Sequence, residues 1–324
     1  MLIVSNTTLS QMEEVNFKLY INKAGESWIT DRFRAEWYKA NNNTTRRISN
    51  ADIVWIISPW TWQKLDKKKL DILKTVCTIH HIDETKVDSD YLDDFKARDK
   101  YVDIYHVPSK KTEAQLNNLT NKPKIQIPFW IDSEKFFEIK NKQALRSKFG
   151  FSDNDYVVGS FQRDTEGYDL ISPKLSKGPD LFIQNLNKLK NQIESKNLKV
   201  LIAGYRRQYI INELKKLKID YTYYKKPSLK ILNELYNCLD LYLVASRVEG
   251  GPMAIMECAI VKTPIVSTDV GISTEVLHPT SIYEIESFES AIPNINFAYE
   301  KAKNFVIKDG MNKFNEMMVN LYES

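Results

Sequence analysis

The chain has 324 residues, of which 43% are hydrophobic and 27% charged, and this composition predicts a folded protein of about two domains. Its formal net charge of +4, without an arginine-rich tract, argues against nucleic-acid binding. No apolar run approaches the roughly 18 residues that span a bilayer, the first residues lack a signal-peptide pattern, and the three cysteines are widely spaced. We therefore expect a cytoplasmic protein with reduced, packed thiols.

The first half alternates short apolar runs with helical patterns, which is typical of a parallel sheet covered by helices. Strands are expected at 17–21, 52–57, 76–80, 104–107 and 125–127, and helices at 28–40, 63–74 and 113–119. The loop after the first strand holds Gly25, Glu26 and Ser27. It lacks the three-glycine pattern of dinucleotide sites, so NAD binding is not expected.

The third predicted strand ends at His80, and His81 follows directly. Neighbouring strand residues point to opposite faces, so this pair makes a poor metal chelate. A purely structural histidine is the alternative to a functional one.

Two short acidic patterns, at 88–90 and 153–155, could suggest a metal that holds a diphosphate. Both lie in polar stretches and not at the end of an apolar strand, so turn or capping aspartates are the better interpretation. We expect no required metal and no cofactor.

Trp60 and Trp62 lie close to three lysines at 67–69. Tryptophan beside lysine is a pattern of proteins that contact a membrane surface. The alternative is a packed tryptophan beside a solvated lysine face, and we favour it over peripheral contact with the inner face of the membrane.

The second half repeats the alternation. Strands are expected at 156–161, 199–203, 221–224, 241–245 and 264–267, and helices at 179–190, 210–217, 228–238, 297–306 and 311–322. Arg163 follows the first of these strands, and Lys177 precedes the helix that starts after Gly178. Cations fixed at such a place can stabilise a departing diphosphate, and Lys174 is the alternative to Lys177.

The most informative segment joins the strand at 241–245 to the strand at 264–267. Its loop carries Glu249, Gly250 and Gly251, and the helix that follows begins near Met253 and Ala254 and carries Glu257. The glycines allow close approach of a ligand, and the N–H groups of the first helical turn form a seat for phosphate.

This segment, two glutamates separated by seven residues in a strand–loop–helix–strand context, resembles the donor motif of retaining glycosyltransferase family 4. The resemblance implies the α/β GT-B fold, in which two Rossmann-like domains with doubly wound parallel sheets face each other across a cleft. It implies an acceptor domain at 1–135, with the helix at 311–324 packing back on it, and a donor domain at 136–310.

The resemblance also implies roles for the site residues. Glu249, Arg163, Lys177 and His80 would be catalytic, with His80 contacting the transferred sugar and His81 as the second choice. The donor would be bound by Gly250, Gly251, Met253, Ala254 and Glu257, and the acceptor side would include Gly25, Glu26, Ser27 and His81.

The expected activity is transfer of a hexosyl group from a UDP- or GDP-sugar, as co-substrate, to a hydroxyl of a glycan or glycolipid acceptor. A nucleotide-sugar epimerase or hydrolase, or a nucleotide-sugar-binding protein without turnover, are the alternatives. The sequence does not indicate the base, the sugar, the acceptor or the oligomeric state.

Overall fold

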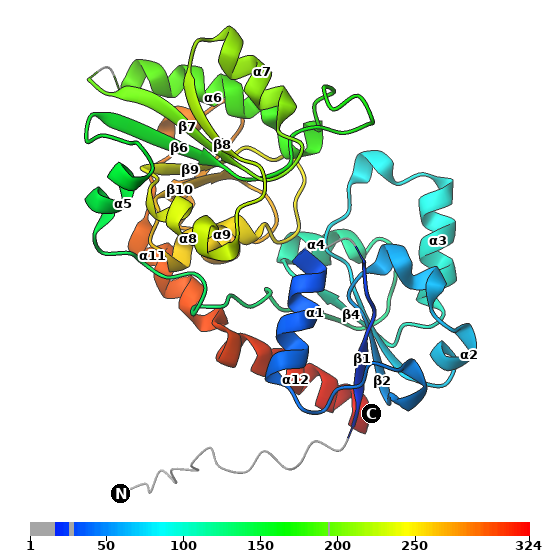
Figure 1. Ribbon diagram of the computed structural model, residues 1–324. Helices are drawn as coiled ribbons and strands as arrows, with labels where there is room; N and C mark the ends of the chain where they lie inside the picture. Colours follow the sequence, from blue (N-terminus) through cyan, green and yellow to red (C-terminus); the bar gives the residue numbers. More distant parts are fainter. Residues whose placement is uncertain (1–16, 26–28, 194) are drawn as a thin grey trace, which may run out of the picture. The chain divides into compact units, whose positions relative to one another are not determined.

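The structure, a computed structural model, describes residues 17–25, 29–193 and 195–324 (Figure 1). It divides into two compact units. Unit 1 comprises Met1–Thr78, Phe95–Tyr105 and Asn315–Ser324, and unit 2 comprises Ile79–Asp94 and His106–Phe314. The stretch that carries both predicted histidines therefore belongs to unit 2, together with the glycine-rich motif.

A five-stranded sheet runs through the first half of the chain in the order β1-β2-β3-β4-β5 (Figure 1). β1 pairs in parallel with β2, and β2 with β3, as expected for strands joined by helical crossovers. The strands are β1 Leu19–Ile21, β2 Ile53–Ile56, β3 Lys74–Thr78, β4 Ile104–Val107 and β5 Lys124–Gln126, close to the predicted ranges. The helices of this half are α1 Ile29–Ala40, α2 Lys67–Leu70, α3 Ser89–Asp99 and α4 Lys110–Leu116, with 3₁₀ turns at Ile48–Asn50, Pro59–Lys64 and Glu84–Lys86.

The helix predicted at 63–74 is wrong. The 3₁₀ turn ends at Lys64, and Leu65 is extended at φ −79°, ψ 148°. Asp66 then starts the four-residue helix α2 by accepting a hydrogen bond from the Lys68 N–H at 3.0 Å. A capping carboxylate accepts hydrogen bonds from the free N–H groups at the start of a helix, so a new helix begins at this point. The apolar residues at 63–74 therefore lie in two short helical turns and not in one continuous helix.

A six-stranded sheet in unit 2 has the order β11-β10-β9-β6-β7-β8, and every neighbouring pair is parallel. Its strands are β6 Asp155–Ser160, β7 Asn197–Ala203, β8 Asp220–Tyr224, β9 Leu241–Val244, β10 Ile265–Thr268 and β11 Ile282–Tyr283. β6 and β9 are neighbours in the middle of the order although 80 residues separate them along the chain, so the strand order reverses there. Ligands of open parallel sheets bind at such switch points, outside the carboxyl ends of the strands.

Helices cover both faces of this second sheet (Figure 1). The helices of this half are α5 Lys142–Lys148, α6 Pro179–Gln192, α7 Gln208–Lys216, α8 Leu229–Asn237, α9 Met253–Ile260, α10 Ser273–Val276 and α11 Ile295–Ala302, with 3₁₀ turns at Leu175–Lys177, Pro279–Ser281, Phe288–Ser290 and Lys303–Phe305. The last helix, α12 Ile307–Glu323, is not part of this layer, because Asn315–Ser324, which includes its second half, belongs to unit 1. Val157 packs in one buried cluster with residues of α8, α9 and α11, and the next residue, Val158, packs in another with α6 and α7. This alternation along β6 produces two apolar cores, one on each face.

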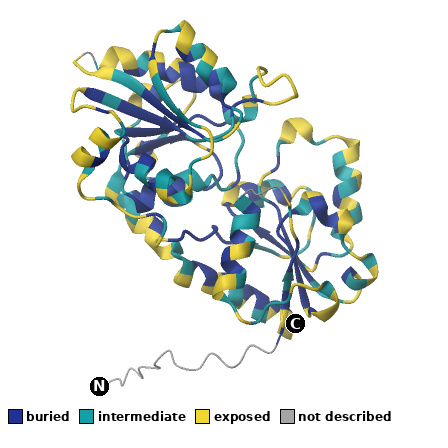
Figure 2. Ribbon diagram, viewed as in Figure 1, coloured by how far each residue is buried: buried dark blue, intermediate teal, exposed yellow. Residues whose placement is uncertain are grey.

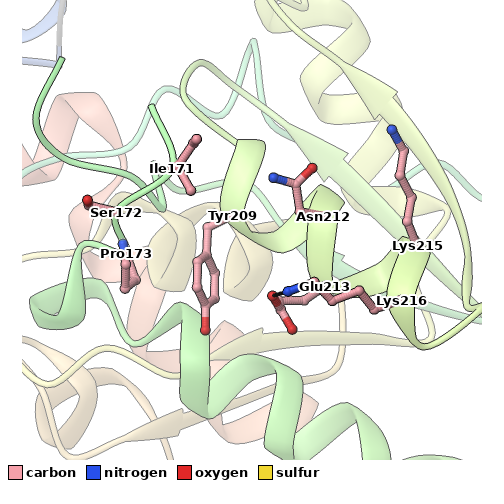
Figure 3. A pocket seen from close by; sticks show the side chains of 8 residues that line it. All are labelled: Ile171, Ser172, Pro173, Tyr209, Asn212, Glu213, Lys215 and Lys216. Atoms are coloured by element: carbon pink, nitrogen blue, oxygen red, sulfur yellow. Dashed lines mark hydrogen bonds and ion pairs between the residues drawn. The ribbon is translucent and has the colours of Figure 1, made fainter. Parts of the chain in front are cut away.

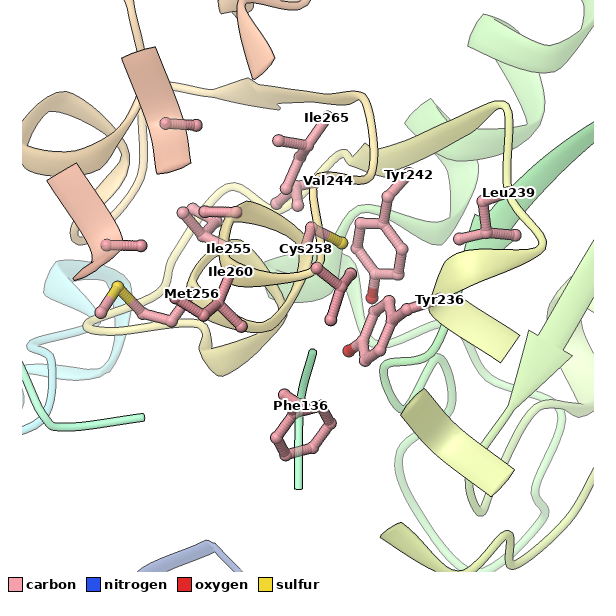
Figure 4. Packing of buried hydrophobic residues seen from close by; sticks show 14 of the residues in the cluster. Phe136, Tyr236, Leu239, Tyr242, Val244, Ile255, Met256, Cys258, Ile260 and Ile265 are labelled. Atoms are coloured by element: carbon pink, nitrogen blue, oxygen red, sulfur yellow. The ribbon is translucent and has the colours of Figure 1, made fainter. Parts of the chain in front are cut away.

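The core that supports the motif helix is rich in aromatic and aliphatic side chains (Figure 4). Met256 and Cys258 of α9 are buried in it, as are Tyr236 and Tyr242. Figure 2 shows the same pattern across the sheets, with buried strands and helices that expose one side. Burial on this scale holds the loop after β9 on a rigid base.

Unit 1 has its own apolar core. The rings of Trp37 and Trp55 meet edge to face at 5.4 Å, and both side chains are fully buried. The Tyr322 ring lies 5.5 Å from Phe17. None of the helices among the described residues is both long enough and apolar enough to cross a bilayer.

Candidate functional site

The loop between β9 and α9 is closely packed at both of its glycines, and Gly250 is required there. A Cβ on Gly250 would overlap the backbone carbonyl of His80, and a Cβ on Gly251 would lie 3.2 Å from Pro108. Pro252 is the N-cap of α9, and its side chain makes no capping hydrogen bond. The predicted start of the helix near Met253 is confirmed.

Glu249 projects from this loop toward Lys177. Its Oε1 lies 2.6 Å from the Lys177 Nζ, and the Ser246 hydroxyl is 3.4 Å from the same oxygen. The two side chains keep 12% and 18% of their exposure, so this ion pair is partly shielded and still reachable by a ligand. Two predicted site residues, 72 positions apart in the chain, are therefore in direct contact.

The segment that carries Lys177 is fixed to the motif loop by its backbone. The N–H groups of Arg247 and Val248 both donate to the Ser176 carbonyl, at 2.9 and 3.0 Å. Gln162 donates to the Lys177 carbonyl at 2.8 Å. Gly178 adopts φ +58°, and a Cβ there would overlap the Ala245 carbonyl, so glycine is required where the segment turns into α6.

Arg163 and Lys174 add positive charge beside Lys177. The Arg163 Nε donates to the Thr165 carbonyl at 2.8 Å. Burial, and then the Lys177 and Arg163 charges, lower the pKa of Lys174. Burial and the nearby Arg206 lower the pKa of Arg163 in the same way. A nearby like charge raises the free energy of the charged form of each side chain, and a bound anion would lower it.

The two histidines have different surroundings. The His80 ring stacks on Phe129 at 5.6 Å. The His81 side chain is exposed. Desolvation by the surrounding protein lowers its pKa, and the Lys177 charge lowers it further, while the Glu249 charge raises it. The structure thus places His81 in the electrostatic field of the Lys177–Glu249 pair.

Glu257 is buried on α9, with 4% of its surface exposed. The Tyr236 hydroxyl donates to its Oε2 at 2.7 Å. Burial, followed by the Glu257 charge, raises the pKa of Tyr236 well above its usual value, so the phenol stays protonated and remains a donor. The second glutamate of the motif is therefore held in a fixed orientation inside the protein.

Sequence analysis missed a buried ion pair at the ends of β6 and β7. Arg207 is fully buried, and its Nε lies 3.0 Å from the Asp164 carboxylate. The available signal was a charged residue soon after each of two apolar strands, Asp164 after β6 and Arg207 after β7.

The long gap between Arg163 and Lys174 forms a hairpin-like loop closed by a bridge between Thr165 and Pro173. A hollow of about 570 Å³ on one side of it is lined by Ile171–Pro173 and by residues of α7, namely Tyr209, Asn212, Glu213, Lys215 and Lys216 (Figure 3). A second hollow, of about 460 Å³, is lined by Gly167, Tyr168, Leu170 and Arg206. Neither is lined by a predicted site residue.

The remaining predicted residues lie elsewhere. Gly25 is in unit 1, in the loop after β1, with φ +76°. Glu26 and Ser27 fall outside the described residues. The acidic pattern at 88–90 behaves as a cap, because Asp88 accepts a hydrogen bond from the Tyr91 N–H at 2.9 Å as α3 begins.

Trp62 and Lys67 follow the packed alternative. Trp62 is 5% exposed, and the Lys67 Nζ lies 4.3 Å from the centre of its ring while it donates to the carbonyls of Trp62, Gln63 and Leu65. Trp60 keeps 46% of its surface exposed.

Comparison with known proteins extends these observations. The family model described as "Glycosyl transferases group 1" matches residues 171–302, which include β7 to α11 and the whole motif. A search of curated protein sequences finds no match. The family match supports a glycosyltransferase.

Solved structures share the fold across most of the chain. HepE from Anabaena, in complex with UDP and glucose, aligns with a TM-score of 0.72 at 12% identity, over 94% of this chain and 99% of its own. A glycosyltransferase from Rickettsia africae aligns at 0.68 and 15% identity, over 94% and 98%. Sucrose-phosphate synthase from Thermosynechococcus elongatus aligns at 0.68 and 13% identity, over 91% and 77%. With two parallel sheets and their helices, the chain has the α/β GT-B fold that the sequence predicted.

Proposed function

We propose that this protein is a retaining glycosyltransferase that moves a hexosyl group from a nucleotide-diphosphate sugar to a hydroxyl of an acceptor, without a required metal. The observation that carries the proposal is the contact of Lys177 with Glu249 of the glycine-rich loop, together with Lys174, which lies in the electrostatic field of Lys177, Arg163 and Glu249. Burial, and then the Lys177 and Arg163 charges, lower the pKa of Lys174, and such a cation near an uncapped helix start suits a diphosphate. The match to glycosyl transferases group 1 over the same segment supports the proposal.

The diphosphate would lie between these cations and the start of α9. The backbone N–H groups of Gly251, Met253 and Ala254 would bind its oxygens. When the bond between the anomeric carbon and the phosphate oxygen breaks, its electron pair stays on the phosphate. Arg163 and either lysine would stabilise that charge, in the place where a metal ion acts in other enzymes.

The two glutamates would hold the two ends of the donor. Glu257, oriented by Tyr236, would accept hydrogen bonds from the ribose hydroxyls. Glu249 would orient hydroxyls of the donor sugar and would exchange part of its contact with Lys177 for them. Either histidine could contact the transferred sugar. The electrostatic influence of the Lys177–Glu249 pair supports His81, and the family resemblance supports His80.

Retention would follow from attack on the face that the diphosphate leaves. The acceptor oxygen bonds to the anomeric carbon, and its proton passes to the departing phosphate, so the products are a glycoside and a nucleoside diphosphate. The solved complexes of HepE with UDP and UDP-glucose make UDP the first nucleotide to test.

The proposal includes a cytoplasmic location and an acceptor that is a glycan or glycolipid. The exposed Trp60, beside a lysine-rich turn, supports peripheral contact of unit 1 with an anionic membrane surface. Co-sedimentation with anionic liposomes tests this part, and pelleting that does not respond to salt or to Trp60→Ala removes it.

The central test has two steps. Thermal shifts with UDP, GDP, ADP and TDP identify the nucleotide, and sugars of that nucleotide are then incubated with and without glycan or lipid acceptors. Release of the nucleoside diphosphate only in the presence of an acceptor is the expected result. Release of the nucleoside diphosphate without an acceptor would indicate a hydrolase, and an epimerised sugar would indicate an epimerase. Binding without turnover would indicate a nucleotide-sugar-binding protein.

A further inference from the structure

The Arg207 guanidinium makes four hydrogen bonds inside unit 2. Its Nε donates to Asp164 Oδ2 at 3.0 Å, and its Nη1 donates to the carbonyls of Ser160 and Ala203 at 2.8 and 3.0 Å. Its Nη2 reaches the Ser160 hydroxyl at 2.9 Å. Ser160 and Ala203 are the last residues of β6 and β7, so one buried side chain joins the carboxyl ends of two adjacent strands.

Asp164 connects this side chain to the cation cluster. It is 1% exposed, its N–H donates to the Arg206 carbonyl at 3.0 Å, and its carbonyl accepts from the Lys174 N–H at 2.8 Å. Asp164 directly follows Arg163 and is the backbone partner of Lys174. The hydrogen bond between Arg207 and the Asp164 carboxylate therefore holds the loop that carries Arg163.

The Arg163 side chain depends on that loop. Its Nε donates to the carbonyl of Thr165, and the Thr165 hydroxyl donates to the Arg206 carbonyl at 3.3 Å. The two residues that follow Arg163, Asp164 and Thr165, are thus held by the turn that contains Arg206 and Arg207. A shift of this turn would move Arg163 with it.

A buried ion pair adds little stability over apolar side chains of the same size, because removing both charges from water costs about as much as their attraction returns. Packing alone does not account for an arginine at the end of two strands. Placement of a neighbouring group is a better-founded role.

We propose that Asp164 and Arg207 are positioning residues that hold Arg163 in place for stabilisation of the departing diphosphate. The inference rests on the proposed function. Neither residue would contact the substrate, so the pair should act on turnover through Arg163 and not independently of it.

A double-mutant cycle tests this coupling. Asp164→Asn with Arg207→Met removes both charges at similar volume, and it is combined with wild-type Arg163 and with Arg163→Ala. We expect the pair change to lower kcat about 10- to 100-fold in the wild-type background, the range of a misplacement near 1 Å, with a smaller effect on KM. In the Arg163→Ala background it should lower kcat less than about threefold, because the group it positions is already absent.

Arg146 and Asp240 provide a matched control at the other end of β6. They lie 2.8 Å apart, and Arg146 also donates to the carbonyls of Cys238, Ser152 and Asp155. Asp240→Asn with Arg146→Met should lower the melting temperature and leave kcat within about twofold of wild type. If the Asp164/Arg207 variant does not melt cooperatively, Arg207→Lys replaces it, since lysine keeps the charge and loses the planar fork.

Equal losses of kcat in both Arg163 backgrounds, or no loss in either, would overturn the inference. Failure of the proposed function is recognised separately, by absence of turnover in the wild-type protein. In that case calorimetric titration with UDP and GDP replaces kcat, and the same cycle of affinities decides the inference. A wild-type protein that binds neither nucleotide overturns both proposals.

Discussion

Glu249 and Glu257 belong to one sequence motif, yet they occupy opposite kinds of surroundings. Glu249 lies in a glycine-rich loop, in a partly exposed ion pair with Lys177. Glu257 lies on a helix inside the apolar core, with a neutral tyrosine as its hydrogen-bond partner. A partly exposed ion pair contributes little stability and can be exchanged for a ligand, whereas a buried hydrogen bond fixes a carboxylate in one orientation. Under the proposed function, the first glutamate would serve the reacting end of the donor and the second would serve donor binding.

If the two glutamates have these different roles, the largest loss of activity is expected when the partner of Glu249 is removed by Lys177→Met. If the ammonium stabilises charge that develops as the sugar leaves, kcat should fall about 100- to 1,000-fold with a much smaller change in KM. Steady-state kinetics with the identified donor provide the measurement.

Lys188→Met is the matched control for this change, because Lys188 also pairs with a glutamate, Glu289, at 3.0 Å on the surface of unit 2. Its kinetics should equal those of wild type. A Lys177→Met enzyme with normal kcat would assign the phosphate contact to Lys174 instead.

At the other end, Glu257→Gln should act on binding. A hydrogen bond to a charged group contributes about 1.5–3 kcal/mol, so the affinity for the nucleoside diphosphate should fall about 10- to 100-fold while kcat changes little. Isothermal titration with the nucleoside diphosphate measures this. Glu234→Gln is the control, because it breaks the ion pair between Glu234 of α8 and Lys148 of α5. A loss in kcat with unchanged affinity would remove the distinction between the two glutamates.

Tyr236→Phe should have a smaller effect of the same kind. Loss of one neutral donor to Glu257 is worth about 1 kcal/mol, or about a fivefold weaker binding of the nucleoside diphosphate. Tyr283→Phe is the control, because the buried Tyr283 hydroxyl donates to the Val244 carbonyl at 2.8 Å in the core on the other face of the sheet. Equal affinity in all three proteins would mean that Glu257 needs no orientation by Tyr236.

Sequence patterns predicted the second half of the fold well because its strands are near-continuous apolar runs and its helices have clear starts. The motif helix begins at Met253 as expected, and the ends of α6 and α8 are within two residues of prediction. The helix expected at 63–74 failed because the local cap at Asp66 outweighed the apolar spacing. α3 was missed because its sequence, which starts at Ser89, is mostly polar.

The sequence named Lys177 and Glu249 as candidate residues, but it did not predict their contact. Glycines, glutamates and cations could be identified from their positions after strands. The pairing of Lys177 with Glu249, or of Asp164 with Arg207, joins residues dozens of positions apart, and it depends on the strand order of the sheet. Local patterns carry no information on that order.

The smallest predicted effect concerns the charge field around the first glutamate. Burial and the Lys177 charge lower the pKa of His81, so its imidazole is neutral at pH 7, and acidification adds a proton only below its ordinary range near 6.5. Lys177→Met should raise this pKa toward the ordinary value, and Glu249→Gln should lower it further, each by a fraction of a pH unit, while Lys188→Met leaves it unchanged. An NMR pH titration of the His81 ring measures all three. A His81 pKa that is the same in wild type and Lys177→Met would show that the ion pair and the histidine are electrostatically independent, and the argument that this field makes for His81 in the proposed site would then fail.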